Sequence, residues 1–120
     1  MILADTSVWV DHLRRGNAAL AERLNNGEVV THEFVLGELL LGHLRRKSPV
    51  IELLAHLPSA PPAIHDEVVA LVRRHRLEGA GLGWVDAHLL ASALQNRLGL
   101  WTLDRRLRDA AEQVGLPEAG

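Results

Sequence analysis

The first ten residues, MILADTSVWV (1–10), decide the fold, because a short apolar run ends abruptly at an acid. The run Ile2-Leu3-Ala4 is typical of a buried strand, and Val8 to Val10 resume an apolar pattern with helical spacing. Asp5 stands between these two signals and is followed by Thr6 and Ser7. An acid at this position has two interpretations: it caps the following helix, or it belongs to a group of acids that the fold gathers.

Short apolar runs alternate with helical patterns along the rest of the chain. We predict strands over residues 2–5, 28–31 and 100–102, and a short edge strand near 62–64. We predict helices over residues 7–15, 17–24, 33–46, from 48–49 onward, 65–77, 85–98 and 105–114. Because no hairpin signals join the strands, the pattern indicates an α/β fold with a short, mostly parallel sheet and helices on both faces. We expect one domain over residues 1–120.

Composition excludes several classes of protein. The chain has no cysteine, which rules out disulfides, thiolate zinc sites and thiol nucleophiles. Its hydrophobic content of 48% is sufficient for a core. Neither a signal peptide nor a bilayer-spanning run is evident, so we expect a cytoplasmic protein without a membrane partner.

Charge and aromatic content do not by themselves indicate a nucleic-acid partner. The net charge of −2 provides no global basic field for nucleic acid. Arginines nevertheless occur in four pairs, which are either ordinary helix surface or phosphate contacts: 14–15, 45–46, 73–74 and 105–106. With one phenylalanine and three tryptophans, the chain is not expected to carry a base-stacking platform.

Three acids are expected at one edge of the sheet. Asp5 and Asp104 follow the first and last predicted strands, and Asp86 lies in the first turn of the helix after a glycine-rich loop. Functional groups of open parallel sheets gather at the carboxyl ends of the strands. Each acid could equally cap a helix N-terminus and interact with its dipole.

Glu38 does not fit the capping interpretation. It lies within FVLGELLL (34–41), a helical run that is apolar nearly all round and is therefore expected to be buried or covered by a partner. A buried glutamate requires an arginine, a proton or a metal ion to balance its charge.

A divalent cation would allow these four acids to lie together. Carboxylates about 6 Å apart repel by about 3 kcal/mol per pair at an effective dielectric of ~20, and a cation relieves this without protonation. Oxygen ligands favour Mg²⁺ or Mn²⁺ over zinc, and the seven histidines lack zinc-site spacing, so we interpret them as surface or supporting residues. Such a metal activates water for phosphoryl chemistry, with Thr6, Ser7 and Thr102 as supporting hydroxyls.

The same residues resemble a known family in four blocks that keep their order. The blocks are residues 2–11 (ILADTSVWVD), 35–42 (VLGELLLG), 81–91 (GLGWVDAHLLA) and 102–104 (TLD). The chain resembles PIN-domain ribonucleases, specifically the VapC toxins of type II toxin–antitoxin systems.

This resemblance implies a three-layer α/β/α sandwich and an Mg²⁺- or Mn²⁺-dependent endoribonuclease. By matching position, the catalytic and metal-binding acids would be Asp5, Glu38, Asp86 and Asp104, with Thr102 as the hydroxyl before the last acid. Implied partners are an RNA substrate, a cognate VapB-type antitoxin, a second subunit and a larger toxin–antitoxin assembly. One departure is the early end of the sequence, which leaves the last edge strand of the family vestigial or absent.

Other functions were compared with this one. An aspartyl-phosphate receiver needs a lysine after its last strand, whereas the only lysine is Lys47. A haloacid-dehalogenase-type phosphatase needs a second aspartate where this chain has Ser7. A catalytically silent PIN-like module that binds a partner through the helix at 33–44 stays open. The RNA target and the number of metal ions also stay open.

Overall fold

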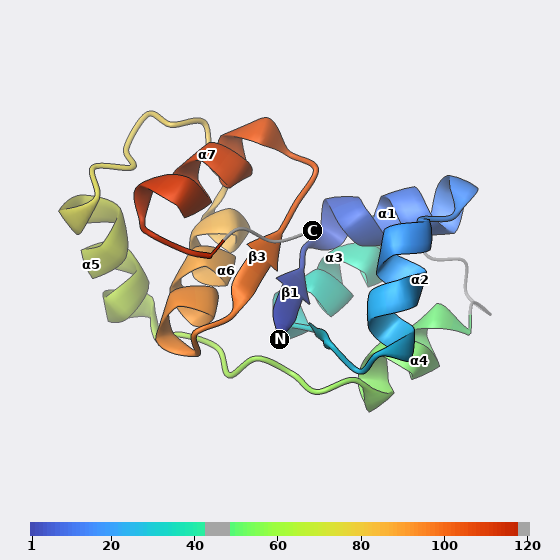
Figure 1. Ribbon diagram of the computed structural model, residues 1–120. Helices are drawn as coiled ribbons and strands as arrows, with labels where there is room; N and C mark the ends of the chain where they lie inside the picture. The colour runs from blue at the N-terminus through green and yellow to red at the C-terminus, as the bar shows by residue number, and fades with distance from the viewer. Residues whose placement is uncertain (43–48, 118–120) are drawn as a thin grey trace.

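The computed structural model describes residues 1–42 and 49–117 and has a parallel sheet at its centre (Figure 1). The sheet contains β1 (Ile2–Ala4), β2 (Val29–Val30) and β3 (Gly99–Trp101), in the order β2-β1-β3 with both pairings parallel. The described helices are α1 (Thr6–Arg15), α2 (Ala18–Asn25), α3 (Glu33–Gly42), α4 (Val50–His56), α5 (His65–Arg74), α6 (Trp84–Gln95) and α7 (Arg105–Gln113).

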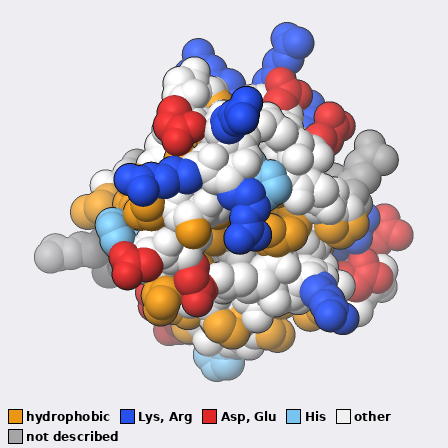
Figure 2. Space-filling model, turned by 90° about the vertical axis from the view of Figure 1, so that its left-hand side faces the viewer, with side chains coloured by type: hydrophobic (Ala, Val, Ile, Leu, Met, Phe, Trp, Pro, Cys, Tyr) orange, Lys and Arg blue, Asp and Glu red, His pale blue; other side chains and the backbone are white. Residues whose placement is uncertain are grey.

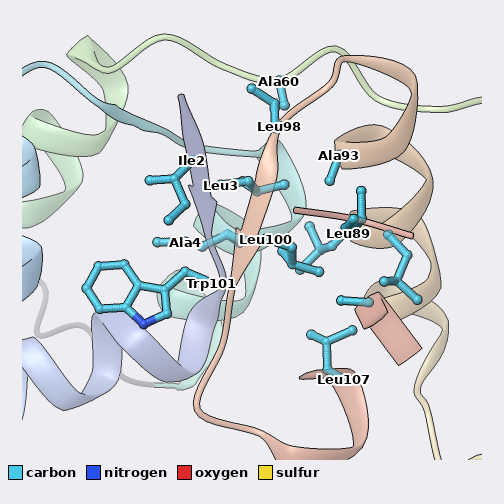
Figure 3. Packing of buried hydrophobic residues seen from close by; sticks show 14 of the residues in the cluster. Ile2, Leu3, Ala4, Ala60, Leu89, Ala93, Leu98, Leu100, Trp101 and Leu107 are labelled. Atoms are coloured by element: carbon cyan, nitrogen blue, oxygen red, sulfur yellow. The ribbon is translucent and has the colours of Figure 1, made fainter. Parts of the chain in front are cut away.

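Helices cover both faces of the sheet, which confirms the predicted α/β/α arrangement. Figure 1 shows α1 to α4 on one side of the strands and α5 to α7 on the other. The central strand β1 is buried along its whole length, and its side chains pack against Leu100 and Trp101 of β3 (Figure 3). Apolar runs as short as ILA and GLW form strands here because helices shield them from water on both faces.

The topology places three helix N-termini at one end of the sheet. Helix α1 begins directly after β1, and α7 begins a few residues after β3. Helix α6 precedes β3 and runs in the opposite direction, so its N-terminus lies at the same end. Acids at the starts of these three helices are therefore brought to the carboxyl end of the sheet, as open α/β sheets usually arrange their sites.

The predicted edge strand near residues 62–64 is wrong. Those residues form no strand, and an isolated parallel bridge joins Thr31 to Ser59 instead. Pro61 and Pro62 lack the backbone N–H that a strand needs for its ladder. The chain here is an extended connection between the two layers of helices.

Several predicted boundaries shift by a few residues. Helix α5 ends at Arg74 and not at 77, because Arg76 adopts a left-handed φ of 53°. Helix α6 ends at Gln95, before Arg97 with a φ of 55°, and so β3 starts one residue earlier than predicted. The predicted helix over 33–46 is observed as far as Gly42, and its remainder lies outside the described residues, as do Arg45, Arg46 and Lys47.

The described part of the chain contains no helix suited to crossing a bilayer. Its longest helix, α6, has 12 residues, whereas a span needs about 20 apolar residues. Up to residue 117, no strand follows α7.

Candidate functional site

Asp5 is the buried carboxylate at the end of β1. Its Oδ1 accepts hydrogen bonds from the backbone N–H groups of Ser7 at 3.0 Å and Val8 at 3.4 Å, so that it caps α1. The Ser7 hydroxyl also donates to Oδ1, and the Thr102 hydroxyl donates to Oδ2 at 2.7 Å. Burial raises the pKa of Asp5 above its ordinary value, while these hydrogen bonds act in the opposite direction. The capping interpretation is therefore correct for Asp5. In addition to capping α1, its carboxylate accepts hydrogen bonds from two side-chain hydroxyls.

Two hydroxyls connect the first strand to the segment after the last. Thr102 is buried, and its Oγ1 accepts the backbone N–H of Asp104 at 3.0 Å while donating to Asp5. The Ser7 Oγ accepts the backbone N–H of Leu103 at 2.9 Å and lies 3.3 Å from the Thr102 hydroxyl. This hydrogen-bond network fixes the loop that carries Asp104 against Asp5, across 97 positions in the sequence.

Asp104 is exposed and caps the last helix. Its Oδ1 accepts the backbone N–H of Arg106 at 2.9 Å. Asp86 is partly buried in the first turn of α6, where its Oδ2 accepts the backbone N–H of Gly83 at 3.0 Å. The pKa of Asp86 is raised by burial first, and then by the negative charges of Asp104 and Glu38. Because Coulomb repulsion falls with distance, this effect identifies Asp104 and Glu38 as neighbouring charges.

Glu38 is exposed in the single chain, so the expectation that the chain itself buries this glutamate is wrong, whereas its cover by a partner stays a prediction. Its Oε1 accepts a hydrogen bond from the Thr6 hydroxyl at 2.7 Å, which ties α3 to the start of α1. The expectation was wrong because α3 buries only one side, on Val35 and Leu39, and presents the other side to solvent. An arginine partner is not needed, since water solvates the charge.

The four acids thus lie at one end of the sheet, with carboxylate oxygens to spare. Among the described residues, Asp86 Oδ1, Asp104 Oδ2 and Glu38 Oε2 accept no hydrogen bond. Over residues 1–42 and 49–117, no three histidine, aspartate or glutamate side chains are already arranged as a set of metal ligands. The donor chemistry still fits a hard divalent cation, because three acids keep an unengaged carboxylate oxygen and the charges of Asp104 and Glu38 act on Asp86.

Two histidines depart from the interpretation of all histidines as surface or supporting residues. His32 is fully buried: its Nδ1 accepts the backbone N–H of Phe34 at 3.0 Å, and its Nε2 lies 3.1 Å from the Ser92 hydroxyl. His88 is 6% exposed and packs between Phe34 and Trp84. The i, i+4 spacing of Trp84 and His88 on one helix was the sequence signal for this ring contact.

Basic side chains form no continuous area on the face that α5 to α7 cover. Figure 2 shows arginines there interspersed with acidic side chains. Arg106 lies two residues after Asp104: its backbone N–H donates to the Asp104 carboxylate, and its side chain packs over Gly81. A Cβ at Gly81 would lie 2.9 Å from Arg106 Cδ, and Gly81 has a φ of 79°. The positive φ favours glycine there, whereas the flexible Arg106 side chain could move aside.

Comparisons with known proteins show the family of this chain. The family model of the PIN domain matches residues 2–113. The chain is 49% identical to "Ribonuclease VapC32" of Mycobacterium tuberculosis, over 97% of this chain and 94% of that protein. It is 38% identical to "Ribonuclease VapC19" of the same organism, over 78% of this chain and 81% of that protein. The chain therefore belongs to the PIN-domain family and, within it, to the VapC proteins.

Proposed function

We propose that this chain is a VapC toxin, an endoribonuclease that hydrolyses RNA phosphodiester bonds with Mg²⁺ or Mn²⁺ at the four acids. The observation that carries the proposal is the set of three unengaged carboxylate oxygens, on Asp86, Asp104 and Glu38, beside the buried Asp5. The 49% identity to a protein named as a ribonuclease supports the same activity.

In this proposal Asp86 and Asp5 hold the principal cation, and Asp104 and Glu38 complete the site. When bound, a divalent cation lowers the pKa of water and balances charge on the phosphoryl group. Asp5 is fixed by the hydroxyls of Ser7 and Thr102, so its carboxylate cannot turn away from the site.

Glu38 is placed to interact with water on the solvent side. Thr6 holds its Oε1 at 2.7 Å, which leaves Oε2 able to accept a proton from an attacking water. Because water is the nucleophile in this scheme, the reaction needs no covalent residue, consistent with a chain that has no cysteine.

The test compares purified wild type with Asp86→Asn and Asp5→Asn on RNA, with Mg²⁺, with Mn²⁺ or with EDTA. We expect metal-dependent cleavage by wild type and at least a hundredfold loss in both variants. Asp109→Asn is the matched control, because Asp109 is an exposed acid on α7 that pairs loosely with Arg105 at 4.0 Å. Cleavage in EDTA, or full activity of Asp86→Asn, would defeat the assignment.

We further propose that an antitoxin and a second subunit cover the outer faces of α3 and α4. Three leucines there are exposed although they are large and apolar: Leu40 at 52%, Leu41 at 93% and Leu53 at 44%. Exposed apolar patches of this kind mark protein interaction sites. A monomer in size determination at high concentration, together with no binding of a co-expressed VapB-type protein, would remove this part of the proposal.

The alternative, a catalytically silent binding module, draws on the same exposed leucines. It predicts partner binding by wild type, Asp5→Asn and Asp86→Asn alike, and no cleavage of RNA with either metal. The cleavage assay above therefore separates the two functions.

A further inference from the structure

A chain of aromatic rings runs from the interior to the surface beside the acids. Successive ring centroids lie 5.2 Å apart from His32 to Phe34, 4.8 Å from Phe34 to His88, 5.0 Å from His88 to Trp84 and 5.3 Å from Trp84 to His65. His32 at one end is fully buried, whereas Trp84 is 46% exposed. Steeply inclined ring contacts such as the 87° between Trp84 and His88 are favourable, so they hold the exposed indole in place.

Trp84 belongs to the same helical turn as Asp86, one of the proposed metal ligands. It is the first residue of α6, and Asp86 follows two positions later in the same helical turn. The Gly83 N–H that precedes Trp84 donates to the Asp86 carboxylate. The Asp86 carboxylate therefore lies against Gly83, which lines the same pocket as Trp84.

Trp84 also forms one wall of a shallow pocket of about 200 Å³. The opposite wall is the loop from Leu77 to Gly83, in which Gly79 and Gly81 have φ values of 76° and 79°. Both glycines line the pocket, together with the acid Glu78. Arg106 packs over Gly81 and so adds a cation at the rim, on the side of Asp104.

We propose that this pocket binds a nucleobase of single-stranded RNA, stacked on Trp84, with Arg106 contacting a neighbouring phosphate. The inference rests on the proposed ribonuclease function and names a substrate subsite for it. Indole rings stack on bases of any sequence, guanidinium groups bind phosphate oxygens, and exposed loop backbone can hydrogen-bond to base edges. A peptide partner is the less favoured occupant, because the cation Arg106 packs over Gly81 of the pocket wall and its backbone N–H donates to Asp104, one of the acids proposed for RNA cleavage.

Fluorescence tests the proposal directly. Trp9 and Trp101 are 0% and 7% exposed, so Trp84 is the tryptophan that a quencher in solution reaches. In EDTA, an uncleavable 2′-O-methyl RNA oligonucleotide should quench this emission and protect it from acrylamide. Binding followed by the anisotropy of the labelled oligonucleotide should be roughly tenfold or more weaker for Trp84→Ala, with partial rescue in Trp84→Phe.

The matched control is Leu94→Ala. Leu94 is an apolar residue on the same helix, 37% exposed, and it lines a different pocket of about 240 Å³. This variant should bind the oligonucleotide like wild type. Saturating oligonucleotide that leaves the Trp84 emission unchanged, or equal affinity of Trp84→Ala and wild type, overturns the subsite.

Failure of the subsite and failure of the proposed function give different results. If wild type cleaves RNA and Trp84→Ala cleaves the same positions with unchanged KM and kcat, the subsite is wrong and the ribonuclease function stands. If the oligonucleotide quenches Trp84 but no cleavage occurs with either metal, the function is wrong and the nucleobase site stands. If neither occurs and a partner protein quenches Trp84, the pocket binds a peptide and the subsite is wrong.

Discussion

Asp5 is proposed to have two roles, helix cap and metal ligand, and two substitutions at this position separate them. Asp5→Ala removes the cap, which is worth about 1 kcal/mol. It also leaves the Ser7 and Thr102 hydroxyls without their acceptor, at about 1 kcal/mol or more each when buried. We therefore expect a loss of about 2–4 kcal/mol, a large part of the stability of a typical domain.

Asp5→Asn should behave differently. Asparagine caps a helix as well as aspartate does, and its Oδ1 can keep the bonds from Ser7 and Val8. The substitution also removes a charge whose burial raises the pKa of Asp5 and disfavours the ionised form. The free energy of unfolding should then stay within about 1 kcal/mol of wild type, while metal-dependent cleavage is lost.

Urea unfolding in EDTA, followed by circular dichroism, measures both variants, and RNA cleavage is measured on the same preparations. The reasoning is refuted if Asp5→Ala is as stable as wild type, because the hydrogen bonds described would then contribute nothing. It is equally refuted if Asp5→Asn still cleaves RNA at the wild-type rate.

Three further predictions concern the surrounding residues. Burial lowers the pKa of His32, so the unfolded chain protonates this imidazole more readily than the folded chain does. The free energy of unfolding should therefore fall as the pH drops below about 6.5. His32→Gln should reduce this pH dependence, as measured by urea unfolding at several pH values. Thr6→Val frees Glu38 and should lower kcat severalfold with less than about 1 kcal/mol of destabilisation, as measured by steady-state cleavage and urea unfolding. Mg²⁺ at a hundredfold excess over Kd should stabilise wild type by about 2.7 kcal/mol and raise its melting temperature. Asp86→Asn should abolish this rise, as measured by thermal melts.

Each of these predictions has an outcome against it. A pH slope unchanged in His32→Gln would assign the titration to other groups. Unchanged kcat in Thr6→Val would show that Glu38 needs no fixed orientation. A full Mg²⁺ shift in Asp86→Asn would place the cation elsewhere.

The sequence predicted the layers and the positions of the acids because both follow from local patterns. The apolar run at residues 2–4 predicts a buried strand that ends where the acid Asp5 follows. Parallel strands then bring their carboxyl ends to one edge of the sheet. The exposure of Glu38 was not predictable from the apolar run around it, since Leu40 and Leu41 are exposed as well. When a helix is apolar on all sides, its sequence does not predict which side packs against the rest of the chain.

Other features depended on contacts between distant segments. The hydroxyl of Thr102 was named as a supporting group, but its simultaneous contacts with Asp5 and Asp104 require the folded sheet. The orientation of the exposed Trp84 ring likewise depends on its contacts with the rings of His65 and His88. Low aromatic content argued against a platform of stacked bases, and it did not exclude a single tryptophan beside the acids.

The contact between Thr102 and Asp5 also bears on how the protein is made. β1 is the first strand to be synthesised and β3 the last, and the two are neighbours in the sheet. Ribosomes add residues from the N-terminus, so a nascent chain released before residue 99 lacks both the partner strand and Asp104. From the role proposed for Asp104, we expect such incomplete copies of the chain not to cleave RNA.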